Sequence, residues 1–128
     1  MQLLISGRNF KIGEELREHV DRRLQFALGK FDREIERIEV GLTDINGPRG
    51  GIDKQCRIVA RMRTLGTVIV EDADEDFYAV VSRAADRIGR SVGRALDRRR
   101  TVKNSRRRQA QAETLEPEEE PEEEPEEV

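Results

Sequence analysis

The fold is decided by residues 77–98, which read FYAVVSRAADRIGRSVGRALDR. At about 100° per residue, the step of an α-helix, the apolar side chains of this stretch gather on one side and its arginines on the other. The apolar set is Phe77, Val81, Ala84, Ala85, Ile88, Val92 and Ala95, and the opposite set is Arg83, Arg87, Arg90, Arg94 and Arg98. The stretch therefore predicts a helix that buries one face in a domain and presents guanidinium groups outside it.

The arginine face of this helix has two interpretations. A planar guanidinium can hold two phosphate oxygens at once, so a row of them suits the backbone of a nucleic acid. The alternative is a well-solvated helix surface, which is what most runs of charge are. Five arginines without a lysine among them favour binding.

The elements around this helix follow from the periodicity of apolar residues. Alternation with a period of two predicts strands at 2–8, 35–44, 54–64 and 67–71, and an apolar stripe among charged residues predicts a first helix at 13–29. Residues 46–51, which read NGPRGG, predict a loop, and Leu65-Gly66 predicts a turn. Four acidic residues at positions 72, 74, 75 and 76 precede the second helix and favour its positive N-terminal end.

The order β-α-β-β-β-α predicts an α+β two-layer sandwich, in which two helices lie on one face of a four-stranded sheet. The first two strands are joined through a helix and should be parallel, whereas the later hairpins should be antiparallel.

A second set of arginines lies on the strand predicted at 54–64. Alternation turns Cys56, Ile58, Ala60 and Met62 towards the core, and it turns Arg57, Arg61 and Arg63 outward. Opposite faces of a domain cannot both touch one flat surface. The strand arginines are therefore secondary to the helix arginines, unless they line a cleft that engulfs the domain.

The net charge of −3 hides a strong segregation of charge along the chain. Residues 1–112 hold all 24 basic residues and 17 of the 27 acidic ones, a net charge of +7, and the remaining ten acidic residues follow from Glu113. A basic domain at 1–102 and a disordered, basic-then-acidic tail at 103–128 are predicted. The basic domain indicates a polyanionic partner. The acidic tail either folds back on the domain and suppresses non-specific RNA binding, or it only aids solubility.

Several classes of function find no support in the residues. The start lacks a secretory leader and no segment is apolar enough to span a membrane, so we expect a cytoplasmic protein with no membrane partner. The lone His19 reads as a boundary residue and the lone Cys56 as a buried thiol, which leaves no metal site and no catalytic pair. The loop at 46–51 lacks the Gly-Lys-Ser/Thr of a nucleotide site. We expect a monomeric binding protein without cofactor or small-molecule substrate, and not an enzyme.

Over residues 1 to about 101 the sequence resembles the ribosome-associated inhibitors called hibernation-promoting factor and protein Y. The likeness rests on the opening Met-Gln-Leu-x-Ile-Ser-Gly-Arg-Asn, on Leu16-Arg17-Glu18-His19-Val20, and on Asp76-Phe77-Tyr78-Ala79-Val80-Val81, where relatives carry Asp-Met-Tyr-x-Ala-Ile. Asp86-Arg87, Arg90, Arg94 and Arg98 fall where relatives carry Asp-Lys, Arg, Lys and Lys. Arg83 matches no basic position of the family and rests on periodicity alone.

The resemblance implies a fold related to double-stranded RNA-binding domains. It also implies binding to ribosomal RNA in the small-subunit cleft for messenger and transfer RNA, which keeps idle ribosomes inactive in starvation or stationary phase. Arg87, Arg90, Arg94 and Arg98 would be the RNA contacts. The second domain of the long forms is not expected, and the acidic tail is similar to the short protein Y branch. The alternative function is a regulatory protein that binds an acidic protein partner, such as an RNA polymerase sigma factor.

Overall fold

The computed structural model describes residues 1–45 and 53–111, with side chains through Arg100. It divides into two compact units, of which the first comprises Met1–Val92 and the second begins at Gly93, within the last helix. The elements are β1 (Gln2–Arg8), α1 (Glu14–Leu28), the 3₁₀ turn η1 (Gly29–Phe31), β2 (Ile35–Asp44), β3 (Lys54–Met62), β4 (Thr67–Asp74) and α2 (Phe77–Gln111).

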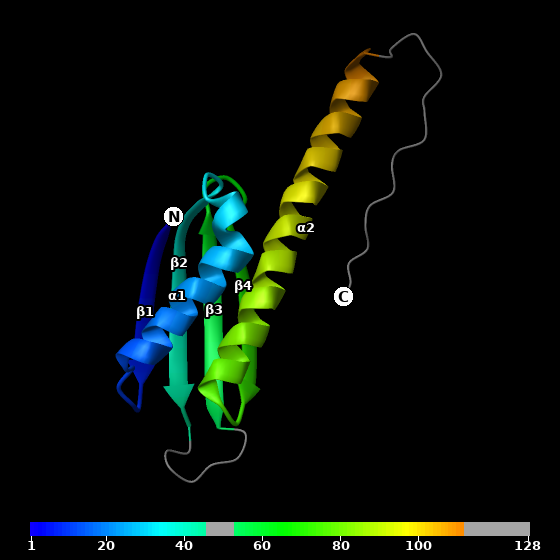
Figure 1. Ribbon diagram of the computed structural model, residues 1–128. Coiled ribbons are helices and arrows are strands. Elements are labelled where there is room, and N and C mark those ends of the chain that lie inside the picture. The colour runs from blue at the N-terminus through cyan, green and yellow to red at the C-terminus, as the bar shows by residue number, and fades with distance from the viewer. Residues whose placement is uncertain (46–52, 112–128) are drawn as a thin grey trace. The chain divides into compact units, whose positions relative to one another are not determined.

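The four strands form one sheet in the order β1-β2-β3-β4 (Figure 1). β1 pairs with β2 in parallel, because α1 returns the chain to the starting end of the sheet. β2 with β3, and β3 with β4, pair antiparallel. The α+β class, the element order and the strand directions predicted from the sequence are confirmed.

Both helices of the first unit lie on one face of the sheet (Figure 1). Alternate residues of β2, namely Ile38, Val40 and Leu42, are buried beneath them. α1 contributes a stripe of buried residues at steps of four. The start of α2 contributes buried residues at the helical spacing that the sequence predicted. These helical core residues are Leu16, Val20, Leu24 and Leu28 from α1, and Val80, Val81, Ala84, Ala85, Ile88 and Val92 from α2. Among the described residues of this unit, no helix lies on the opposite face of the sheet.

α2 begins where Asp76 caps it. The Ala79 amide donates to Asp76 Oδ2 at 3.2 Å, which satisfies one of the free N–H groups at the helix start. Farther along, α2 passes close to α1 at Gly89. A Cβ atom at Gly89 would lie 3.1 Å from the Ala27 carbonyl oxygen, so the missing side chain permits the close approach of the two helices.

Three predicted boundaries are wrong. β4 continues to Asp74 rather than ending at Glu71, and β3 ends at Met62 rather than Thr64, because Gly66 (φ +91°) closes the hairpin there. α2 continues past Arg98 to Gln111, because the sequence beyond is rich in Arg, Lys, Gln and Ala, which favour helix without a partner. The predicted loop at 46–51 and the acidic part of the predicted tail lie outside the described residues. Residues 103–111, predicted to be disordered, are helical as the end of α2. The domain division at residue 102 stays a prediction.

Candidate nucleic-acid interface

Arg83, the first arginine of the α2 row, is held by the end of β4. Its Nε donates to Asp72 Oδ2 at 2.8 Å and its Nη1 donates to Asp74 Oδ2 at 2.9 Å. Its Nη2 donates to Asp72 Oδ1 at 3.2 Å and to the Ala73 carbonyl at 2.9 Å. Four hydrogen bonds therefore direct this guanidinium into the protein's own surface and not towards a partner.

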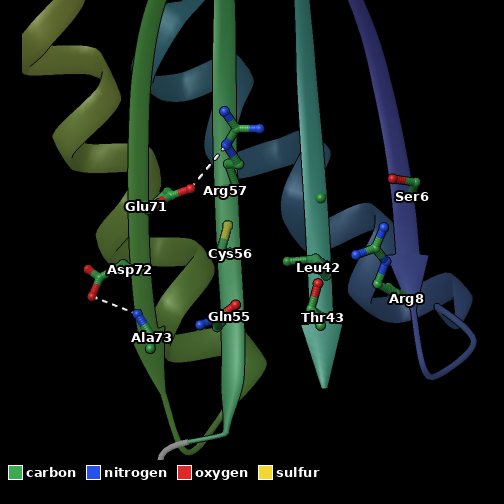
Figure 2. A pocket seen from close by; sticks show the side chains of 11 residues that line it. Ser6, Arg8, Leu42, Thr43, Gln55, Cys56, Arg57, Glu71, Asp72 and Ala73 are labelled. Carbon is green, nitrogen blue, oxygen red and sulfur yellow. Dashed lines mark hydrogen bonds and ion pairs between the residues drawn. The ribbon is translucent and has the colours of Figure 1, made fainter. Parts of the chain in front are cut away.

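Arg87, one turn later, shares the same carboxylate. Its Nη1 donates to the Glu71 carbonyl at 3.1 Å and to Asp72 Oδ2 at 3.3 Å. Asp72 thus receives two arginines from consecutive turns of α2. Figure 2 shows Asp72 with its Oδ1 accepting the amide of Ala73 (2.8 Å), which fixes the carboxylate beside the strand.

The charges in this cluster shift one another's ionisation. The Arg83 hydrogen bond, aided by the Ala73 amide, holds the pKa of Asp72 below its ordinary value, although burial opposes the shift. Arg83 likewise lowers the pKa of Asp74, and the amides of Glu75 and Asp76 add to the effect. The same carboxylates raise the pKa of Arg83. The cluster is fully charged at neutral pH, and its positive charge is largely balanced within the fold.

Arg90 differs from both. It is exposed, and it makes no hydrogen bond or ion pair with the residues that the structure describes. In the second unit, taken by itself, Arg94 is half-buried and Arg98 is exposed. The arginines of the predicted row therefore lie in different environments. Among those of the first unit, Arg90 is the one whose charge is available to a partner.

The strand arginines Arg57 and Arg61 lie on the helix-free face of the sheet, as the alternation predicted. Arg57 Nε lies 3.1 Å from Glu71 Oε2, and both side chains are exposed (Figure 2). Arg61 donates from Nε and Nη2 to the two oxygens of Glu39, each at 3.2 Å, and this lowers the pKa of Glu39. The Arg57–Glu71 pair is exposed and therefore weak, so a phosphate competes most readily for Arg57. The Arg61–Glu39 pair is partly buried and makes two contacts, so it holds its arginine more firmly.

Arg63 was expected on the same outward face, but it lies past the end of β3. Its Nε donates to the Arg33 carbonyl at 3.0 Å, and its amide donates to the Glu34 carbonyl at 3.0 Å. The hairpin turn that ends β3 breaks the strand alternation at this point. Arg63 is therefore not brought together with Arg57 and Arg61.

Arg8 was not among the RNA contacts predicted from the sequence. It ends β1 on the helix-free face, in register with Thr43, and it lines a shallow hollow with Ser6 and Arg57 (Figure 2). Among the described residues it has no ion pair or hydrogen bond. Leu3 and Ile5 set the inward positions of β1, so the alternation alone could have placed Arg8 on the outward side.

The two candidates for reactive chemistry do not come together. Cys56 is buried in β3, where burial raises the pKa of its thiol to about 12. His19 faces α2 instead, with its Nε2 3.1 Å from Ser82 Oγ and 3.2 Å from the Tyr78 carbonyl oxygen. Within residues 1–45 and 53–111 no cluster of three or more metal-ligating side chains is present. No described helix is long and apolar enough to cross a membrane.

Comparison with known proteins gives a consistent result. The family model described as Sigma 54 modulation protein / S30EA ribosomal protein matches residues 3–100. The ribosome hibernation promotion factor of Picosynechococcus sp. is 28% identical over 93 residues, which are 72% of this chain and 47% of the relative. The chain thus spans about half the length of that relative.

Two solved structures share the fold. The N-terminal domain of Protein Y from Thermus thermophilus is 28% identical with a TM-score of 0.57, over 73% of this chain and 98% of that one. A ribosomal subunit interface protein from Coxiella burnetii is 19% identical with a TM-score of 0.63, and the match covers 73% of this chain and 94% of that one. This likeness supports the fold alone. The resemblance stated from the sequence is confirmed.

Proposed function

The chain belongs to the Sigma 54 modulation protein / S30EA ribosomal protein family, and we propose on this premise that it is a ribosome-associated translation inhibitor. It binds ribosomal RNA of the small subunit in the cleft for messenger and transfer RNA, and it keeps idle cytoplasmic ribosomes inactive. Proteins at 28% identity to it include a ribosome hibernation promotion factor and the N-terminal domain of Protein Y.

One observation carries the proposal: available cations lie on both faces of the first unit. Arg90 projects from the helical layer, whereas Arg8 and Arg57 lie on the helix-free face of the sheet. A flat partner would meet only one of these layers. A cleft walled by RNA meets both, and guanidinium groups on both faces can bind its phosphates without reading base sequence.

The inhibition requires no chemistry at the protein. A folded domain in the cleft excludes messenger and transfer RNA by its volume, and phosphate contacts supply the affinity. The ion pairs at Arg57 and Arg61 hold those side chains extended over the sheet until a phosphate replaces the carboxylate. Arg83 and Arg87 serve mainly to fix α2 against β4, and Arg94 and Arg98 of the second unit are further phosphate contacts.

The test is sedimentation with purified small subunits, coupled to a cell-free translation reaction. The full chain is expected to sediment with the subunits and to lower protein synthesis. The double variant Arg8→Glu and Arg90→Glu should lose both effects, while the matched variant Arg8→Lys and Arg90→Lys, which keeps the charge, should retain most of them. A full chain that stays unbound would overturn the proposal.

A second function has one specific observation in its favour, because the family description also names modulation of sigma 54. The same cations would then meet an acidic protein surface. Competition separates the two: a purified sigma factor should not displace the chain from small subunits if the ribosome is its target. Displacement at equal concentrations, or a sigma complex that survives nuclease treatment and excludes the subunit, would favour the second function.

A further inference from the structure

An exposed aromatic ring stands on the outer side of α1. Phe26 is 81% exposed, whereas the other large apolar side chains at the described surface, Leu4, Ile45, Ile69 and Tyr78, are 50% exposed or less. A single exposed apolar residue is common and proves nothing by itself. The surroundings of this ring decide what it does.

The surroundings are cationic. The stretch 22–31 reads RRLQFALGKF and contains no acidic residue. On a helix, residues three and four positions apart lie side by side, so Arg22 and Arg23 lie one turn before the ring. Lys30 follows α1 in η1, and its Nζ lies 5.3 Å from the centroid of the Phe31 ring. Arg22 and Lys30 are exposed and make no ion pair with the described residues. Arg23 is held by Asp86 of α2, with Nη2 to Oδ1 at 3.0 Å.

α2 adds a further cation at the same level. Arg23 meets Asp86, and one turn later Ala27 meets Gly89, so the two helices run side by side in the same direction here. Arg90 follows Gly89 directly and stands one turn beyond Asp86. It therefore lies on α2 at the level that Phe26 occupies on α1. Asp86, the carboxylate one turn before Arg90 on α2, is paired with Arg23.

We infer that this patch, made of Phe26, Arg22 and Arg90, receives an unpaired RNA base. The base stacks on the ring of Phe26, and the phosphates on either side of it bind the cations. Aromatic rings and flanking arginines or lysines are how proteins hold single-stranded RNA without reading its sequence. The inference rests on the proposed function in taking RNA as the partner, and it adds a specific nucleotide contact on α1.

The composition of the patch favours RNA over a protein partner. The centre of a protein interface is depleted of charge and built from several apolar side chains packed together. Phe26 instead has Gln25 beside it and cations around it, with no second exposed apolar side chain on the described outer face of α1. A single aromatic ring surrounded by cationic side chains is complementary to an RNA base and its flanking phosphates.

The test compares the full chain bound to a short unstructured RNA and to a fully paired RNA duplex of the same length. Phe26→Ala should weaken binding of the single strand about 5- to 100-fold, the loss expected for one stacked base, and should leave the duplex unchanged. Phe26→Trp should retain the affinity for the single strand, because tryptophan also supplies an aromatic ring on which a base can stack. Ile69→Ala, which truncates an exposed apolar residue on the other face of the domain, is the matched control and should change neither.

The outcomes separate this inference from the proposed function. Equal affinity of Phe26→Ala and the parent chain for the single strand overturns the inference. An equal loss for single strand and duplex overturns it as well, because stacking acts only on unpaired bases. If the parent chain binds small subunits and Phe26→Ala binds them equally well at every salt concentration, the proposed function stands without this contact.

Discussion

Arg83 is joined to Asp72 by two hydrogen bonds, Nε to Oδ2 at 2.8 Å and Nη2 to Oδ1 at 3.2 Å. This two-point contact fixes the second turn of α2 to the end of β4, and Arg87 reaches the same carboxylate from the next turn. Two of the arginines predicted to bind RNA are therefore part of the fold itself. Arginines that hold the domain together are thus distinct from arginines that are available to a partner.

The carboxylates of β4 should make the stability of the domain sensitive to acid. The pKa of Asp72 is lower in the folded chain than its ordinary 3.8, so its contribution is present above 3.8 and is lost as the pH falls through the lower, folded value. Asp72→Asn should lower the melting temperature at neutral pH, and the gap to the parent chain should close in strong acid. Asp21→Asn, at an exposed position of α1, is the control. Parallel melting curves for Asp72→Asn and the parent across the whole pH range would contradict the role of this contact.

Arg83 and Arg90 should behave in opposite ways when each is changed to glutamine. Arg83→Gln should lower the melting temperature and change affinity for small subunits little, because its donors are already used within the fold. Arg90→Gln should leave the melting temperature unchanged and weaken binding, with a log–log salt slope shallower by about one. Thermal melts and sedimentation of the two purified variants measure both effects. Equal losses of affinity in the two variants would show that the ion pairs of Arg83 open on binding.

The helix crossing should not tolerate a large side chain at Gly89. Its Cβ would already lie 3.2 Å from Ala27 Cβ, and a valine would add two methyl groups beyond it. Gly89→Val should lower the free energy of unfolding by roughly 1–3 kcal/mol, the usual cost of overpacking. Gly29→Ala is the control, since a Cβ there meets nothing and the residue is already in helical conformation. Urea denaturation that found no difference between Gly89→Val and the parent would mean that the helices separate freely.

Cys56 should be inert in the folded protein. Burial raises the pKa of its thiol to about 12, so the reactive thiolate is almost absent at neutral pH. A thiol-specific dye should label the native chain very slowly and the urea-unfolded chain at once. Rapid labelling of the native chain would show that β3 opens to solvent.

Most of the fold could be predicted because it depends on short-range patterns. β1 and β2 end where alternation ends, and α2 begins at Phe77, after the acidic residue that caps it. The end of β4 was missed because Asp72 and Asp74 are typical of a helix start as well as of an exposed strand. Only their contacts with Arg83 decide between the two, and those contacts depend on where α2 lies.

The candidate site could be predicted only in part, for the same reason. Helical periodicity placed Arg83 and Arg90 on one side of α2, but periodicity cannot tell a paired guanidinium from an available one. Phe26 was overlooked although a signal was present: it lies about 200° from Leu24 and Leu28 of the buried stripe, so it must face outward. Whether an outward ring is a site depends on neighbours from another helix, which a single sequence does not reveal.

The most direct test of the central claim is sedimentation of the full chain with small ribosomal subunits across a range of salt concentrations. If about five to eight phosphates are neutralised, affinity should fall with salt along a log–log slope of roughly −4 to −6. The double variant Arg8→Glu and Arg90→Glu should bind weakly at every salt concentration. Binding that ignores salt, or that survives this double reversal, would contradict an interface built from phosphate contacts on both faces of the domain.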